Sequence, residues 1–191
     1  SQVTLVSSRD QVLPGEDSDA AKVVQGVFAT RGMKVISQSR AVRVTRTDTG
    51  VAVELSTGEV ITGSHCLMAV GSLPNTEELG LSKVGVITND AGFIEVDKVS
   101  RTSVRGIYAA GDCTGVMMLA SVAAMQGRIA MWHALGDSVH PLNLETVSSN
   151  VFTDPEIATV GVSQADVDSG KETANVLNLP LATNARAKMQ G

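Results

Sequence analysis

The sequence predicts an α/β fold, in which helices and strands pack as layers around an aliphatic core. Two observations support this class. Hydrophobic residues make up 43% of the 191 residues but aromatic residues only 3%, a mix that suits helices packed on sheets better than an aromatic-rich β-sandwich. Apolar residues also recur at helical spacing in some segments and at strand spacing in others.

The chain begins with a strand–helix–strand pattern. We expect a strand at 3–6, followed by a helix that Asp17 or Ser18 caps, because their side-chain oxygens can accept hydrogen bonds from the first backbone N–H groups. Gly32 closes this helix, since glycine is the residue that most easily ends a helix in a left-handed conformation. A second short strand then starts at 34–36.

Strands joined by tight turns follow. Segments 41–46, 51–55 and 60–62 alternate or nearly alternate between apolar and polar residues, and glycine-containing turns separate them, which predicts hairpins. Segment 65–70 is a continuous apolar run, and we expect it to be a strand buried on both faces. It ends in a turn that starts with Gly71.

The middle of the chain combines short strands with one long helix. Strands at 86–88 and 93–96 flank a turn, and a short apolar strand at 106–110 ends on residues 111–112. A helix from about 119 to 135 is so rich in apolar residues that we expect it to be heavily buried.

The last part of the chain predicts two further strands, at 149–152 and 158–162. Residues Ser163 to Asp166 then resemble a capping box, with aspartate in place of the usual glutamate. The chain starts directly in a strand without an initiator methionine and stops after an ordered-looking segment. We therefore expect it to be an internal part of a longer protein.

The composition argues against several partners. The net charge of −5 gives no electrostatic attraction to nucleic acid or anionic lipid, and no apolar stretch is long enough to span a membrane. Cys66 and Cys113 have neither metal-binding nor redox spacing. We expect both cysteines to be small buried residues of a protein in a reducing cytoplasm. The sequence thus predicts a cytoplasmic protein without metal, nucleic-acid partner or membrane insertion.

Asp112 is the first candidate functional residue. A carboxylate at the end of a buried strand is unfavourable unless it has a partner, and it can accept hydrogen bonds from sugar-like hydroxyls. Gly111 lacks a side chain that would block close approach, and the free N–H groups near 118–120 favour negative charge. A ligand with a hydroxyl chain beside Asp112 and an anionic ring beside the N–H groups would fit this site. A reduced flavin with its ribityl tail is such a ligand. The alternative is that Asp112 only caps a turn.

Four segments are similar to motifs of one family and occur in its order and spacing. They read TSVRGIYAAGD at 102–112, MLAS at 118–121, AVGSLPNT at 69–76 and VFTDPEIATVG at 151–161. Segment 102–112 resembles the second FAD motif, and segment 118–121 resembles the segment whose backbone meets the flavin ring. Segment 69–76 resembles the end of the nucleotide domain, and segment 151–161 resembles the start of the dimerisation domain. The family is that of the pyridine nucleotide-disulfide oxidoreductases, which include dihydrolipoamide dehydrogenase and glutathione reductase.

The resemblance implies two nested FAD- and NAD(P)-binding Rossmann-like domains, followed by the start of an α+β dimerisation domain. Residues 1–70 would be the C-terminal part of the NAD(P)-binding domain, 71–145 the returning part of the FAD-binding domain, and 146–191 the start of the interface domain. The resemblance also implies a homodimer with FAD and NAD(P)H as cofactors.

The resemblance also assigns cofactor contacts. The residues implied to contact FAD are Gly111, Asp112, Met118, Leu119, Ala120 and Ser121. Those implied to contact NAD(P) are Ser7, Ser8, Arg9 and Gly71. No catalytic residue is expected in this segment, because the family's Cys-x4-Cys dithiol lies upstream of these motifs and its His-Glu pair lies downstream.

Two departures from the family pattern concern specificity. Ser7 stands where relatives commonly offer a glutamate to the adenosine ribose, and Ser8 and Arg9 follow it. Serine hydroxyls together with the Arg9 guanidinium could bind the 2′-phosphate of NADPH, which a glutamate would repel. The alternative is that Arg9 is solvated and NADH binds through the backbone. Ser72 replaces an arginine that most relatives have, and the combination resembles the actinobacterial NAD(P)H quinone reductase branch, which lacks the dithiol.

The expected function is therefore that of an FAD-dependent oxidoreductase. It would pass hydride from NAD(P)H to FAD and then to a quinone or a disulfide. The alternative is a non-catalytic descendant that keeps the flavin in a structural or signalling role.

Overall fold

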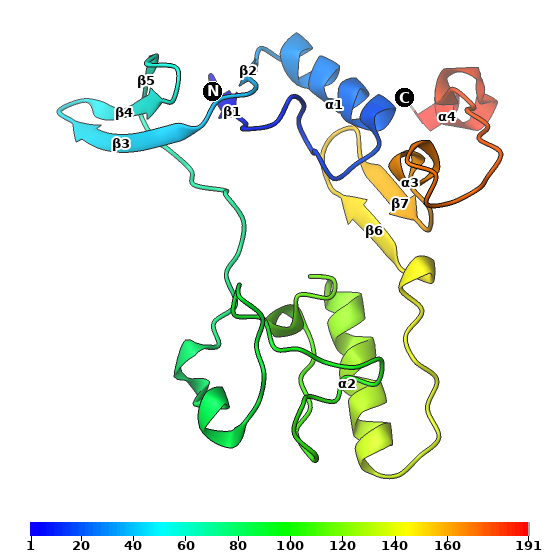
Figure 1. Cartoon of the computed structure of the whole chain (residues 1–191). Coiled ribbons are helices and arrows are strands. Elements are labelled where there is room, and N and C mark those ends of the chain that lie inside the picture. Colours follow the sequence, from blue (N-terminus) through cyan, green and yellow to red (C-terminus); the bar gives the residue numbers. More distant parts are fainter. Residues whose placement is uncertain (191) are drawn as a thin grey trace.

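The computed structural model describes residues 1–190, which contain four α-helices and three small sheets. Figure 1 shows an upper group, with strands β1–β5, helix α1 and the C-terminal elements, and a lower group around α2. Two extended connections join the groups. Mixed helix and strand content confirms the predicted α/β class. Because the described strands form separate sheets, the division into nested nucleotide domains stays a prediction.

The strand–helix–strand unit at the start is confirmed. Strand β1 (Thr4–Val6) pairs in parallel with β2 (Lys34–Ile36), and α1 (Ser18–Thr30) crosses between them. Helix α1 buries Ala21 and Val24, and after it Gly32 adopts a φ of 85°. This left-handed conformation, which a side chain disfavours, turns the chain into β2.

The predicted capping of α1 by a side chain is wrong. Asp17 is the N-cap residue, but its side chain accepts no hydrogen bond from the first turn of the helix. Its Oδ1 instead accepts a hydrogen bond of 2.9 Å from the backbone N–H of Gln164, which is distant in sequence. A tertiary partner has thus replaced the local one.

The second sheet has the predicted hairpin topology. Strands β3 (Ala41–Thr47), β4 (Gly50–Leu55) and β5 (Val60–Gly63) are antiparallel in the order β3-β4-β5. Within it, Leu55 is fully buried.

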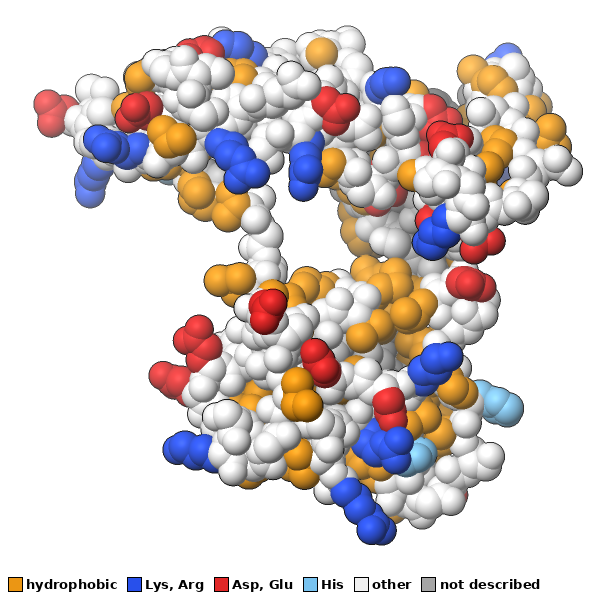
Figure 2. All heavy atoms as spheres, viewed as in Figure 1, with side chains coloured by type: hydrophobic (Ala, Val, Ile, Leu, Met, Phe, Trp, Pro, Cys, Tyr) orange, Lys and Arg blue, Asp and Glu red, His pale blue; other side chains and the backbone are white. Residues whose placement is uncertain are grey.

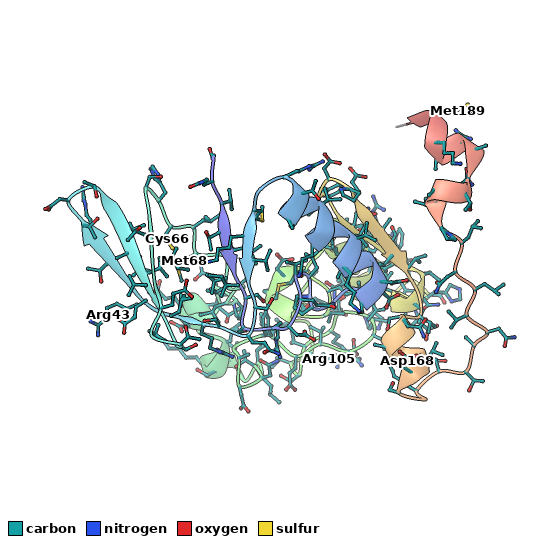
Figure 3. The ribbon with its side chains drawn as sticks, turned by 90° about the horizontal axis from the view of Figure 1, so that it is seen from above. Arg43, Cys66, Met68, Arg105, Asp168 and Met189 are labelled. Carbon is teal, nitrogen blue, oxygen red and sulfur yellow. The ribbon has the colours of Figure 1, made fainter. Side chains whose placement is uncertain are left out.

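The prediction of a buried strand at 65–70 is wrong. This segment forms the extended connection between the two groups and pairs with none of the strands described in residues 1–190 (Figure 1). Leu67 is 89% exposed and Val70 83%. Cys66 is exposed as well, beside Met68 (Figure 3), so its predicted burial is also wrong. An apolar run becomes a buried strand only when neighbouring strands cover it.

The lower group contains fewer strands than predicted. The hairpin at 86–96 is reduced to one bridge between Thr88 and Ile94, and the strand at 106–110 to a bridge between Arg101 and Tyr108. Elsewhere the backbone forms loops and short 3₁₀ helices, five in all within the described residues. They are η1 (Glu77–Leu79), η2 (Leu81–Val84), η3 (Asp112–Thr114), η4 (Leu144–Thr146) and η5 (Leu181–Thr183).

Helix α2 (Ala120–Ala134) confirms the predicted long helix, but only one face of it is buried. The residues on that face are Val122, Gln126, Ile129 and Ala130. On the other side Met131 is 60% exposed and Trp132 48%, so the expectation of a heavily buried helix is too strong. No helix within residues 1–190 is both long and apolar enough to span a membrane.

Two contacts join the C-terminal part of the chain to the ends of α1, from Asp154 to Arg31 and from Gln164 to Asp17. Strands β6 (Ser148–Val151) and β7 (Ile157–Val160) form an antiparallel pair, followed by α3 (Gln164–Asp168) and α4 (Ala185–Gln190). The predicted capping box at the start of α3 is confirmed, because the Ser163 and Asp166 side chains each accept a hydrogen bond from the other residue's backbone N–H. Arg31, just after α1, donates to the Asp154 backbone and carboxylate at 2.9 and 2.6 Å.

Candidate flavin and nucleotide site

The turn at Gly111 lies tightly against the first turns of α2. Gly111 has a φ of 87°, and a Cβ built on it would lie 3.3 Å from the Cβ of Ala123. Four residues later a Cβ on Gly115 would lie 2.8 Å from the ring of Phe93. The two glycines therefore let the turn fit between the helix and this ring, where side chains would collide.

A ring of buried hydrogen bonds fixes the turn. The Gly111 N–H donates to Gln126 Oε1 at 2.8 Å, and the Thr114 hydroxyl donates to the Gly111 carbonyl at 2.8 Å. Gln126 Nε2 completes the ring by donating to Thr114 Oγ1 at 3.4 Å. Gln126 is 5% exposed and Thr114 8%, so these bonds are shielded from water.

Asp112, the next residue in the turn, is exposed. No group within residues 1–190 donates a hydrogen bond to its carboxylate, and the carboxylate does not cap η3. The alternative that Asp112 only caps a turn is therefore wrong. The expectation of a carboxylate at the end of a buried strand is also wrong, because the preceding segment forms only one bridge. The Asp112 carboxylate is thus an exposed acceptor without a hydrogen-bond donor within residues 1–190.

The start of α2 offers donors near this turn. Leu119 is the N-cap in an extended conformation, without a side-chain cap, and the first helical hydrogen bond runs from Ala123 N–H to the Leu119 carbonyl. The N–H groups of residues 120–122 accordingly have no acceptor within residues 1–190. A helix start with free N–H groups carries partial positive charge and favours an anionic ligand.

The four residues implied to meet the flavin ring, 118–121, lie at this helix start. Ala120 and Ser121 are exposed, and Met118 is 44% exposed. Figure 2 shows hydrophobic side chains gathered on the face of the lower group that looks toward the upper group. Exposed Val116 and Met118 come just before α2. An apolar surface next to free amides suits a flat ring with a polar edge.

The predicted NAD(P) residues form a second turn, at the end of β1. Ser7 Oγ accepts a hydrogen bond of 3.1 Å from the Arg9 N–H, and the Arg9 carbonyl accepts one from Gln38. Ser8 and Arg9 are exposed, and within residues 1–190 the Arg9 guanidinium forms no ion pair. The structure thus brings three of the four predicted residues together at a strand end.

Gly71 is the fourth predicted NAD(P) residue, and it lies apart from this turn. It ends the exposed segment 65–70 with a φ of 111° and has open space around its Cα. The turn at the end of β1 and the turn before α2 also lie in different groups of Figure 1.

Sequence reasoning missed Gln126 and Thr114. Gln126 falls between Val122 and Ile129 on the buried face of α2, and a polar residue at such a position is the signal that could have identified it. Buried amides require hydrogen-bond partners, so this residue could have been expected to bind a neighbouring loop.

A strand–helix–strand unit with a polar turn at the end of its first strand, together with a glycine-aspartate turn beside an open helix start, is typical of dinucleotide-binding α/β proteins. Residues 1–127 match the family described as Pyridine nucleotide-disulphide oxidoreductase. The chain belongs to this family, as the sequence motifs predicted.

Similar proteins give more detail. The chain is 56% identical over 187 residues to the NAD(P)H dehydrogenase (quinone) of Mycobacterium tuberculosis, covering 98% of this chain and 38% of that protein. It is 35% identical over 195 residues to the dihydrolipoyl dehydrogenase of Zymomonas mobilis, covering 100% of this chain and 42% of that protein. The chain therefore spans about two-fifths of the length of these curated relatives.

Two solved structures show the same fold. The crystal structure of LpdA from Mycobacterium tuberculosis matches with a TM-score of 0.93 and 56% identity, over 99% of this chain and 41% of that one. The HOCl-induced flavoprotein disulfide reductase RclA from Escherichia coli matches with a TM-score of 0.88 and 26% identity, over 100% of this chain and 44% of that one.

Proposed function

We propose that the protein is an FAD-dependent oxidoreductase that passes hydride from NAD(P)H to FAD and then to a quinone or a disulfide. The observation that carries this proposal is the Asp112 carboxylate, which is fixed by the turn around it yet has no hydrogen-bond donor within residues 1–190. Relatives named as a quinone dehydrogenase and a dihydrolipoyl dehydrogenase support an enzyme over a non-catalytic flavin protein.

The residues around Asp112 fit FAD. The carboxylate can accept hydrogen bonds from ribityl hydroxyls, Gly111 removes steric hindrance, and the free N–H groups of 120–122 can stabilise negative charge on a flavin ring. When bound, FAD supplies the redox chemistry, whereas the protein supplies binding, orientation and charge. The role of residues 111–122 in this proposal is to hold the flavin. The absence of catalytic side chains from the chain stays a prediction.

The turn at Ser7, Ser8 and Arg9 is our proposed site for the adenosine end of NAD(P)H. It contains two hydroxyls and one guanidinium that forms no ion pair within residues 1–190. These groups can bind a 2′-phosphate, so we propose a preference for NADPH. Gly71 stays a proposed contact that depends on residues 65–76 packing beside this turn.

We also propose a cytoplasmic homodimer. Residues 146–190 expose several large apolar side chains, among them Phe152 at 82%, Val160 at 63% and Leu177 at 95%. Apolar surface of this kind favours association with a second copy. The domain ranges 1–70, 71–145 and 146–191 belong to the same proposal.

Anaerobic rapid mixing of the purified FAD-bound protein with NADPH or NADH tests the function. We expect the flavin absorbance to bleach quickly and to return when a quinone such as menadione is added. Faster recovery with lipoamide than with menadione would assign a disulfide acceptor instead. A flavin that either coenzyme leaves oxidised would refute the proposed hydride transfer and favour the non-catalytic alternative.

A further inference from the structure

Gln126 is a buried polar residue that packing alone does not explain. It lies on the apolar face of α2, between Val122 and Ile129, and is 5% exposed. A methionine or leucine would fill the same volume without burying an amide. The amide therefore needs a reason in its hydrogen bonds.

Those hydrogen bonds all lead to the turn that contains Asp112. Gln126 Oε1 accepts from the Gly111 N–H at 2.8 Å, and Gln126 Nε2 donates to Thr114 Oγ1, whose hydroxyl donates to the Gly111 carbonyl at 2.8 Å. Both polar backbone groups of Gly111 are thus bound, directly or through Thr114, by one side chain of the helix.

The ring of bonds holds the backbone on both sides of Asp112. Gly111 has φ and ψ of 87° and −159°, a conformation that glycine adopts but does not favour over many others. The preceding segment is held by backbone hydrogen bonds from Thr102 to Ile107 and from Ala109 to Ser100. The Gly111 N–H, in contrast, donates to no backbone carbonyl within residues 1–190, and its acceptor is Gln126 Oε1. Gln126 is therefore the residue that joins this part of the turn to α2.

We propose that Gln126 is a positioning residue for the flavin: it holds the turn so that the Asp112 carboxylate faces the ribityl hydroxyls. This inference rests on the proposed function, since it assumes that Asp112 binds FAD. Gln126 is 5% exposed, so its proposed effect on the flavin is through Asp112.

The test is a double-mutant cycle on FAD affinity, measured by titrating apoprotein with FAD and following flavin fluorescence. Gln126→Met keeps the volume and removes both hydrogen bonds, so we expect the Kd for FAD to rise about tenfold, the effect of one lost bond to a charged group. In an Asp112→Ala background the same substitution should change the Kd less than about twofold, because the group it positions is gone.

Two further variants separate positioning from folding. Thr114→Val removes two of the three hydrogen bonds of the ring but keeps the one from the Gly111 N–H to Gln126 Oε1, so we expect a smaller rise in Kd that also disappears in the Asp112→Ala background. Ile129→Val makes a small cavity on the same face of α2 and leaves every hydrogen bond of the ring in place, so it should lower the melting temperature without changing the Kd. If the Gln126→Met protein does not fold, the same comparison is made with Thr114→Val, whose effect on the Kd is measured with and without Asp112→Ala.

Each outcome has one meaning. Equal effects of Gln126→Met in both backgrounds, or an effect of Ile129→Val on the Kd as large as that of Gln126→Met, would overturn the positioning role and leave Gln126 a packing residue. An Asp112→Ala protein that binds FAD as tightly as the unaltered protein would instead overturn the assignment of Asp112, and with it the basis of this inference.

Discussion

Replacing Asp112 with alanine should weaken FAD binding without weakening the fold. The carboxylate is exposed and accepts no hydrogen bond within residues 1–190, so its loss removes no bond from the protein itself. A hydrogen bond to a charged acceptor contributes about 1.5–3 kcal/mol, which corresponds to a rise in Kd of about 10- to 150-fold. Water at the exposed carboxylate should place the result near the lower value.

The assay is the same fluorescence titration, with a melting curve of the apoprotein beside it. Asp137→Ala is a matched control, because Asp137 is also exposed, follows the other end of α2, and its carboxylate accepts no hydrogen bond within residues 1–190. We expect this control to change neither the Kd nor the melting temperature. A Kd unchanged in Asp112→Ala, or one raised equally in both variants, would refute the argument.

Three other predictions concern the coenzyme, the turn and pH. Ser7→Glu and Arg9→Ala should each lower kcat/KM for NADPH more than for NADH; an unchanged ratio would show that the coenzyme is selected elsewhere. Gly111→Ala should cost about 1–3 kcal/mol in the free energy of unfolding, because φ is 87° and the new Cβ would lie 3.3 Å from Ala123; an unchanged denaturation midpoint would contradict this. Hydrogen bonds from Lys171, then from Ser163, lower the pKa of Asp166 to about 2, so its stabilising effect is complete above pH 3.8 and is lost as the pH falls toward 2. Asp166→Asn should remove this part of the pH dependence of unfolding, and parallel curves for the two proteins would exclude it.

The elements that were predicted correctly depend on local signals. Gly32 ends α1, turns at glycines separate β3, β4 and β5, and Ser163 begins α3, because each signal acts within a few residues. The same locality explains the errors. Segment 65–70 has the composition of a buried strand, but burial requires neighbouring strands, and none of those described pairs with it.

The candidate site was predicted in part for the same reason. The motifs identified the turn at Gly111 and the start of α2, yet not the residue that joins them, because Gln126 reaches 15 residues back along the sequence. Asp17 fails as a cap because it binds Gln164, 147 residues away. Periodicity finds the face of a helix that is buried but does not identify the partners of a polar atom on that face.

The two contacts that hold the C-terminal elements on α1 limit how the protein can bend. Asp17 and Arg31 flank a helix of 13 residues, so their contacts to Gln164 and Asp154 are separated by about 20 Å. A single contact would allow the C-terminal elements to rotate about it. Two contacts this far apart also fix the angle between α1 and the C-terminal elements. The lower group has a different attachment, since the extended connections at 65–70 and 136–143 join it to this braced upper group.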